Sequence, residues 1–211
     1  MTDTTIDARF WDRAARKYAA SQIKDLAGYE RTLDRTREYL RSTDTVLELG
    51  CGTGTTAMKL APHVSRLIAT DVSSAMIAIA REKSASQGDT NTEFTVVAAN
   101  EVPRAERSFD AVLAFNLLHL LAQRPALYAQ VHGLLKPGGL FITKTPCLAE
   151  MNRLIRVAVP VMRAIGKAPN VEFFTAVDLR NEIEAAGFKI IEQARHGSQR
   201  KDARTFIVAT N

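Results

Sequence analysis

The sequence has little cysteine, no long apolar run and no dense block of one charge. Its two cysteines, Cys51 and Cys147, and its four scattered histidines form no close group at metal-ligand spacing. We therefore expect no disulfide framework and no metal site, and the cysteine usage fits a reducing compartment. No apolar stretch reaches the ~18 residues that span a bilayer. The polar N-terminus also lacks the apolar core of a signal peptide. These absences favour a cytoplasmic protein.

The composition is that of an ordinary globular chain, with 46% hydrophobic and 24% charged residues among 211. It excludes disordered, collagen-like and disulfide-rich classes. Since α/β folds often form one unit of up to ~250 residues, we expect a single domain over residues 1–211. The net charge of +5 is spread along the chain. Without a run of Lys and Arg, nucleic acid is not an expected partner, and a mildly basic surface favours anionic ligands.

Strand-like and helix-like segments alternate along the chain. Two amphipathic helices are expected first, at about 10–21 and 29–40, within an N-terminal segment of residues 1–41. Five apolar strands follow, with helices between them, at 45–49, 66–70, 93–98, 109–115 and 140–145. Strands that are apolar throughout are typical of a parallel sheet covered on both faces. The pattern therefore predicts a doubly wound, Rossmann-like α/β fold.

The C-terminal segment departs from this alternation. A helix at about 177–186 ends at a glycine and is followed by strands at 188–194 and 204–210. The short polar connection between these strands suits a hairpin, because a parallel crossover needs a dozen or more residues. We therefore expect seven strands, mostly parallel, with an antiparallel C-terminal edge hairpin and helices on both faces.

A glycine-rich loop carries the strongest functional signal. The run VLELGCGTG, Val46 to Gly54, follows an apolar strand and precedes a helix. Glycine lets the backbone approach a ligand with no Cβ in the way. Asp71 closes the next strand, 21 residues after Gly50. That spacing predicts a carboxylate that accepts hydrogen bonds from two ribose hydroxyls at the carboxyl end of the sheet.

Two residues around the loop bear on the kind of nucleotide. The last position of a dinucleotide fingerprint falls on Thr55, whose β-branched side chain hinders close helix–strand packing. Glu48, just before the loop, repels a pyrophosphate but suits a sulfonium or an amino group. These residues favour S-adenosylmethionine over NAD. An NAD(P)-dependent oxidoreductase and a non-catalytic cofactor-binding module remain as alternatives.

Four motifs in order make the chain resemble the class I S-adenosylmethionine-dependent methyltransferases of small-molecule type, from about Phe10 to the C-terminus. The motifs are VLELGCGTG, TDVSSAMIAIA, SFDAVLAFNLLHLL and VHGLLKPGGLFITKT. The resemblance implies the Rossmann-like fold, S-adenosyl-L-methionine as cofactor and S-adenosyl-L-homocysteine as product.

The resemblance also implies a set of cofactor-binding residues. They are Tyr18, Glu48, Gly50, Cys51, Gly52, Gly54, Asp71, Val72, Met76, Ala99, Asn100 and Asn116. Among them Asp71 is expected on the ribose, Val72 and Met76 on the adenine, and Tyr18 over the cofactor. Family members often carry an acid where this chain has Ala98, so Asn100 or a backbone group is expected to serve the adenine amino group.

Methyl transfer from a sulfonium depends on alignment and desolvation, and it needs a base only when the nucleophile arrives protonated. His119, just after the fourth strand, is the candidate base, with simple packing as the alternative. Lys144, near the end of the fifth strand, is expected close to the active face with its ammonium in solvent. Cys51 has no nearby histidine to activate it as a nucleophile.

The segment 147–172 is expected as an insertion that forms a lid or part of the acceptor pocket. Its apolar residues recur at helical spacing, at Met151, Leu154, Ile155, Ala158, Met162 and Ile165. Pro160 is expected to break or kink that helix. The basic residues are Arg153, Arg156, Arg163 and Lys167, and the acids are Glu150 and, at the end of the segment, Glu172. An apolar underside with a basic rim favours an amphipathic or anionic acceptor. Peripheral contact with a membrane and ordinary packing on the sheet are the alternatives.

The sequence therefore predicts an enzyme that transfers a methyl group from S-adenosylmethionine to a small-molecule nucleophile by in-line displacement. The accepting atom is open among O, N, C and S, and the oligomeric state is open too. A quinone or phospholipid methyltransferase acting at a membrane surface is the alternative within the same class.

Overall fold

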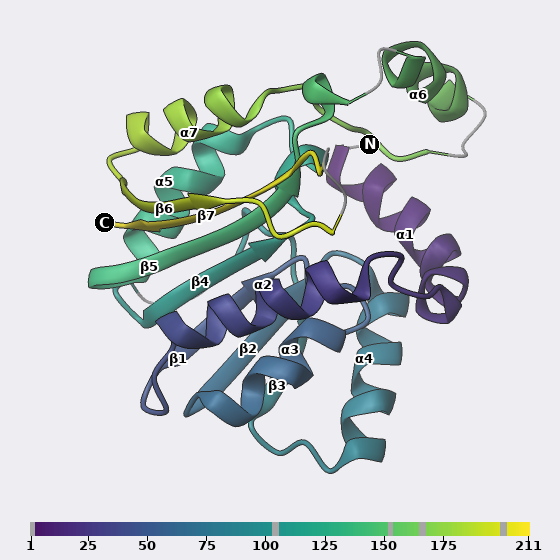
Figure 1. Cartoon of the computed structure of the whole chain (residues 1–211). Helices are drawn as coiled ribbons and strands as arrows, with labels where there is room; N and C mark the ends of the chain where they lie inside the picture. The colour runs from purple at the N-terminus through teal and green to yellow at the C-terminus, as the bar shows by residue number, and fades with distance from the viewer. Residues whose placement is uncertain (1–2, 103–105, 152–153, 165–167, 199–201) are drawn as a thin grey trace.

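The computed structural model describes residues 3–102, 106–151, 154–164, 168–198 and 202–211 (Figure 1). Their strands form one seven-stranded sheet in the order β3-β2-β1-β4-β5-β7-β6. The strands are β1 (Thr45–Leu49), β2 (Arg66–Asp71), β3 (Thr92–Val96), β4 (Phe109–Phe115), β5 (Leu135–Pro146), β6 (Lys189–Ala194) and β7 (Arg204–Thr210). The first five are mutually parallel, and β7 is antiparallel to both of its neighbours. The predicted fold class is confirmed.

Seven α-helices and three short 3₁₀ turns surround the described strands. The helices are α1 (Asp3–Ala20), α2 (Leu26–Tyr39), α3 (Thr55–Leu60), α4 (Ser74–Gln87), α5 (Arg124–Leu134), α6 (Leu154–Ala164) and α7 (Ala176–Ala185). The 3₁₀ turns are η1 (Ala61–His63), η2 (Leu118–Leu120) and η3 (Leu148–Glu150). In the described ranges, no helix combines the length and the apolarity needed to cross a bilayer.

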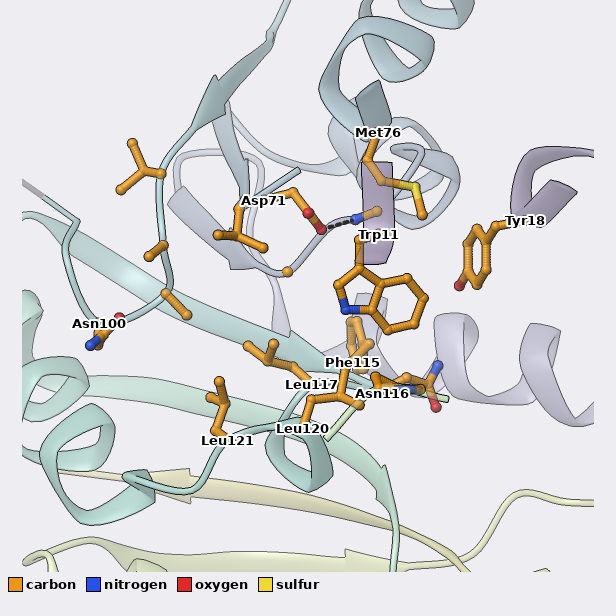
Figure 2. Close-up of a pocket in the computed structure, with 17 residues that line it drawn as sticks. Trp11, Tyr18, Asp71, Met76, Asn100, Phe115, Asn116, Leu117, Leu120 and Leu121 are labelled. Atoms are coloured by element: carbon orange, nitrogen blue, oxygen red, sulfur yellow. Dashed lines mark hydrogen bonds between the residues drawn. The ribbon is translucent and has the colours of Figure 1, made fainter. Parts of the chain in front are cut away.

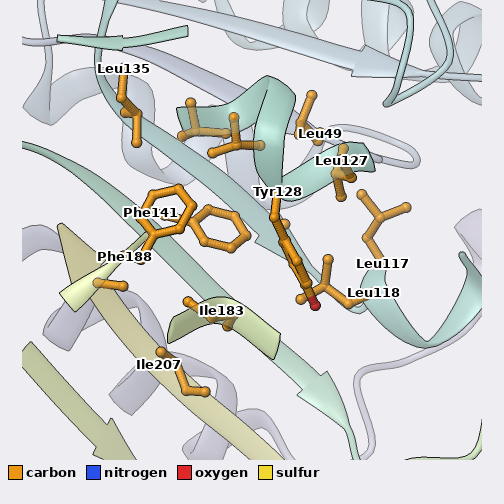
Figure 3. Close-up of a cluster of buried hydrophobic side chains, with 14 of the residues drawn as sticks. Leu49, Leu117, Leu118, Leu127, Tyr128, Leu135, Phe141, Ile183, Phe188 and Ile207 are labelled. Carbon is orange, nitrogen blue, oxygen red and sulfur yellow. The ribbon is translucent and has the colours of Figure 1, made fainter. Parts of the chain in front are cut away.

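The sheet has an apolar core on each face, because neighbouring residues of a strand point to opposite sides. Leu47 and Val112 pack with side chains of α5 and α7, around the fully buried Tyr128 (Figure 3). Val46 and Leu113 pack on the other face with side chains of α2, α3 and α4. Strands buried on both faces explain the apolar runs in the sequence.

The N-terminus of α4 is fixed by a cap that also holds α1. Ser73 is the N-cap of this helix, and its hydroxyl accepts from the Met76 amide at 3.1 Å. The same hydroxyl donates to the Asp12 carboxylate of α1 at 2.6 Å. Asp12 also accepts from the Ala75 amide at 3.1 Å. A carboxylate at a helix N-terminus is stabilised by the free backbone amides there. Asp12 therefore attaches α1 to the N-terminus of α4 by both charge and hydrogen bonds.

The predicted hairpin is present, and its second strand lies between β5 and β6. Because β7 runs against β5, its first residue lies beside the last residue of β5, with Arg204 opposite Pro146. This places the start of β7 at the edge of the sheet where the parallel strands end. Residues far apart in the sequence therefore share one rim.

Of the two expectations for Pro160, a break or a kink, the break is wrong, because α6 runs from Leu154 to Ala164 through this residue. In Figure 1, α6 stands away from the sheet, and the Leu154 side chain is 72% exposed. Several predicted positions, Arg153, Ile165 and Lys167 and the side chain of Arg156, lie outside the part that the structure describes.

Candidate functional site

The site lies where the parallel strands end, at the carboxyl edge of the sheet. The loop after β1 contains Gly50, Gly52 and Gly54, with φ of 65°, 55° and 75°. This left-handed region costs a residue with a Cβ roughly 1–2 kcal/mol, so glycine is favoured at each position. Asn116, directly after β4, also has a positive φ of 53°. Asparagine tolerates that conformation better than most residues. The backbone N–H of Asn116 donates to the backbone carbonyl of Lys144 at 2.7 Å.

Asp71 and the glycine loop lie on the same rim, as the spacing predicts. The Gly52 amide donates to the Asp71 carboxylate at 2.8 Å, and the Ser73 amide donates to its other oxygen at 2.9 Å. Figure 2 shows the first of these bonds at one wall of a pocket. Burial raises the pKa of Asp71, while the hydrogen bonds from Ser73 and Gly52 act in the opposite direction. The carboxylate is thus held at the mouth of the loop.

The glycine-loop pocket brings together most of the predicted residues. Those that line it are Tyr18, Gly50, Gly52, Asp71, Val72, Met76, Ala99, Asn100 and Asn116. The remaining wall is mainly apolar and is formed by Val97, Ala98, Phe115, Leu117, Leu120, Leu121 and Pro169 together with Trp11. One carboxylate in an apolar surround is suited to a ligand with a ribose-like diol and a flat apolar base.

Helix α1 supplies two aromatic side chains to this pocket. Trp11 and Tyr18 are seven residues apart, so they lie on one face of the helix, with ring centroids 6.2 Å apart in an edge contact. In Figure 2 the Trp11 indole lies between Met76 and Phe115. Trp11 is not among the predicted cofactor-binding residues, although its seven-residue spacing from Tyr18 places both side chains on one helix face.

A second pocket adjoins the first and lies beside α2. We call it the α2 pocket, and the two pockets share Tyr18, Phe115 and Asn116. Its other lining residues include Ile23, Tyr29, Thr32, Leu33, Cys51, Thr53, Thr56, Lys144 and Arg204. Cys51 of the glycine loop therefore faces this pocket rather than the first. Burial raises the pKa of its thiol well above the ordinary value, so the thiol stays protonated at neutral pH.

Glu48 lies beneath the loop and lines neither pocket. Its side chain is 2% exposed, and within the described residues its Oε2 atom has no hydrogen-bond partner. Burial, and then the nearby Asp71 carboxylate, raises the pKa of Glu48 to about 8. A cation bound close to this carboxyl would favour its ionised form.

The structure does not bring two other predicted residues to either pocket. Gly54 faces the core, where a Cβ would lie 2.7 Å from the Phe94 ring and 2.9 Å from the Ala80 side chain. The His119 imidazole lines neither pocket, and its Nδ1 atom lies 3.1 Å from the Thr145 hydroxyl oxygen. Burial lowers the pKa of His119 to about 4, so the ring is neutral at physiological pH. No group of three or more His, Cys, Asp or Glu side chains suited to a metal occurs among the described residues.

Comparison with known proteins agrees with this geometry. Residues 46–139 match the family model described as a methyltransferase domain. An arginine-hydroxylase NDUFAF5 of Danio rerio is 29% identical over 185 residues, 82% of this chain and 56% of that protein. A demethylmenaquinone methyltransferase of Clavibacter sepedonicus is 35% identical over 98 residues, 46% of this chain and 39% of that protein. The chain spans about half the length of the NDUFAF5 relatives it matches.

A solved structure extends the likeness of fold to the whole chain. The magnesium protoporphyrin IX methyltransferase of Synechocystis PCC 6803, crystallised with bound SAH, superimposes with a TM-score of 0.73. The superposition covers 100% of both chains at 18% identity. At this level of identity the likeness concerns the fold alone.

The neighbouring glycines of the loop predict different costs for the same added methyl group. Gly52→Ala should lower the free energy of unfolding by ~1–2 kcal/mol, the cost of its left-handed backbone. A Cβ there has only the Tyr18 ring, at 3.6 Å, within contact distance. Gly54→Ala has the same backbone cost and should lose a further ~1–3 kcal/mol by overpacking against Phe94 and Ala80. Urea unfolding measures both, and equal losses would contradict the assigned packing of Gly54.

The buried Glu48 carboxyl predicts a stability that falls as pH rises. Between its ordinary pKa of 4.5 and about 8, the folded chain keeps a proton that the unfolded chain releases. The free energy of unfolding therefore decreases with pH across this window. Since a pKa difference of one corresponds to ~1.4 kcal/mol, wild type should lose a few kcal/mol relative to Glu48→Gln between pH 5 and about 9. Urea unfolding of both chains measures the difference, and parallel profiles would show that Glu48 titrates normally.

Proposed function

Because the chain belongs to the class I S-adenosylmethionine-dependent methyltransferases, we propose that it methylates a small-molecule nucleophile. The observation that carries this proposal is the hydrogen bond between Gly52 and Asp71 at the entrance of an apolar pocket. It sets a carboxylate beside backbone that has no side chain in the way. We also propose that residues 1–211 form a single domain and that the segment 147–172 forms a lid or part of the acceptor pocket.

The residues of the glycine-loop pocket fit the cofactor that this family uses. We assign the ribose to Asp71, which can accept from both hydroxyls, and the adenine to the apolar surface of Val72 and Met76. Ala98 provides no carboxylate, so the adenine amino group is assigned to Asn100 or to backbone near it. Space at Gly52 is essential, since an added Cβ would enter the pocket between the loop and Tyr18.

The carboxyl of Glu48 has a separate role in this proposal. When bound, S-adenosylmethionine supplies a methyl group on a positively charged sulfonium, next to a positively charged amino group. Glu48 is the buried acid beneath the loop, so it stabilises positive charge above it when it is ionised. Its raised pKa keeps it neutral in the absence of such charge, which lowers the cost of burying it.

The chain's contribution to the reaction is positioning and exclusion of water. Trp11 and Tyr18 cover the pocket from α1, and Phe115 with Asn116 forms the boundary with the α2 pocket. A nucleophile held in the α2 pocket would face the first pocket across this boundary. Alignment and removal of solvent account for much of the rate of such displacements. His119 is not assigned as a base, because it lines neither pocket.

A quinone-type or phospholipid acceptor at a membrane surface remains the alternative within the class. The name of the Clavibacter relative supports a quinone precursor. The exposed apolar side chains of α6 support contact with a lipid surface.

A second candidate function is hydroxylation of an arginine side chain. It is favoured by the names of the NDUFAF5 relatives, which match 76–82% of this chain. The α2 pocket favours methylation, because its Lys144 and Arg204 repel a guanidinium. Mass spectrometry of arginine peptides incubated with the chain, dioxygen and a two-electron reductant distinguishes the two functions. A gain of one oxygen atom would support hydroxylation, whereas an unmodified peptide agrees with a small-molecule acceptor.

Removing the Asp71 carboxylate tests the cofactor assignment. Asp71→Ala should weaken S-adenosylhomocysteine binding at least about tenfold, since charge-assisted hydrogen bonds contribute ~1.5–3 kcal/mol each. Asp110→Ala is a matched control, because Asp110 also accepts a backbone amide, that of Thr45 at 2.8 Å, but at the opposite edge of the sheet. Titration calorimetry measures both. An unchanged dissociation constant in folded Asp71→Ala would refute the assignment of Asp71 to the ribose.

A further inference from the structure

Lys144 is a buried cation whose hydrogen bonds go to neutral groups. Its side chain lies near the end of β5, and the residue is 7% exposed. The ammonium donates to the Thr32 hydroxyl at 2.7 Å and to the Gly28 carbonyl at 3.4 Å. Among the described residues, no carboxylate lies within ion-pair distance of it. The expectation that this ammonium lies in solvent is therefore wrong.

The sheet places the Lys144 side chain on the face that α2 covers. Side chains two residues apart in a strand point to the same face, so Lys144 shares the face of Ile142, which packs in the core beneath α2, α3 and α4. Helix α2 passes over this position and supplies both Gly28 and Thr32. Two protein acceptors leave one N–H of the ammonium for the α2 pocket, which Lys144 lines.

Two carboxylates, Asp202 and Asp25, act electrostatically on Lys144 and raise its pKa, but neither forms an ion pair with it among the described residues. Asp202 accepts through Oδ1 from the Arg204 guanidinium at 2.9 Å, while its buried Oδ2 has no hydrogen-bond partner within the described residues. Asp25 accepts from the Ser198 amide and hydroxyl at 2.8 and 2.7 Å, and it lies 3.8 Å from Arg204. Arg204 is therefore a cation with counter-charges, whereas Lys144 is not. A buried charge without a partner is costly, and an anionic ligand would remove that cost.

We propose that the α2 pocket is the acceptor subsite and that Lys144 selects acceptors carrying a carboxylate. The inference rests on the proposed function, because the subsite is defined by its boundary with the glycine-loop pocket. Tyr29 and Phe115 line the same pocket and provide flat apolar surface within it. The acceptor class is a small aromatic acid, with the carboxylate on Lys144 and the nucleophile turned toward Asn116.

The protonation of Lys144 agrees with an anion-binding role. Burial lowers the pKa of Lys144 to about 8, so most of the amine is protonated at neutral pH and a modest rise in pH neutralises it. A carboxylate bound beside it would favour the ammonium. Lys144 is in this sense a specificity residue, since it contacts the acceptor and not the cofactor.

Binding of benzoate and benzamide, two molecules of the same shape and different charge, tests the proposal. Titration calorimetry is carried out on the full chain saturated with S-adenosylhomocysteine. Wild type should bind benzoate at least about tenfold more tightly than benzamide, as expected for a charge-assisted hydrogen bond. Lys144→Met should remove this preference and leave S-adenosylhomocysteine binding unchanged.

Lys136→Met is the matched control, because Lys136 lies at the other end of β5 and pairs with Asp110 at 2.8 Å. It should retain the preference for benzoate. Wild type that binds neither probe, or both equally, overturns the proposal, as does a folded Lys144→Met that still prefers benzoate. If Lys144→Met does not fold, the comparison of benzoate with benzamide on wild type decides the proposal. Failure of S-adenosylhomocysteine to bind wild type would instead count against the proposed function, and benzoate binding is then measured without it.

Discussion

The hydrogen bond from the Gly52 amide to the Asp71 carboxylate is the contact on which the site depends. It joins the ends of two adjacent parallel strands, β1 and β2, and it is supported by the Cys51 amide, which donates to the Thr70 carbonyl at 2.9 Å. Together these bonds continue the pairing of the strands into the loop. The loop thus has its shape before any ligand arrives, and little binding energy is needed to order it.

The two faces of the sheet divide stability from chemistry. The face under α5 and α7 is filled with apolar side chains around Tyr128 (Figure 3). The face under α2 and α3 also has an apolar core, but near the carboxyl edge it contains Glu48 on β1 and Lys144 on β5. Strand β4 lies between these two strands. One buried acid and one buried base are therefore held apart rather than paired.

The sequence predicts this molecule best where the deciding interactions are local. Helix α4 begins at a Ser73 cap and ends at Gly88, residue types that favour those two positions. Three strands, β1, β4 and β7, have their predicted bounds. The glycine loop and Asp71 are also foreseeable, because strand order brings their positions together. The burial of Lys144 is not, since it depends on how α2 crosses the sheet. The turning of His119 toward Thr145 likewise depends on packing between distant segments.

The reversed direction of β7 has a consequence for how such a fold can diversify. A strand that ran parallel to β5 would place its first residue at the far edge, away from the loop. Because β7 runs the other way, Arg204 at its start borders the α2 pocket, whereas the described lining of the glycine-loop pocket ends at Pro169. A substitution at Arg204 therefore changes the wall of one pocket and leaves the lining residues of the other in place.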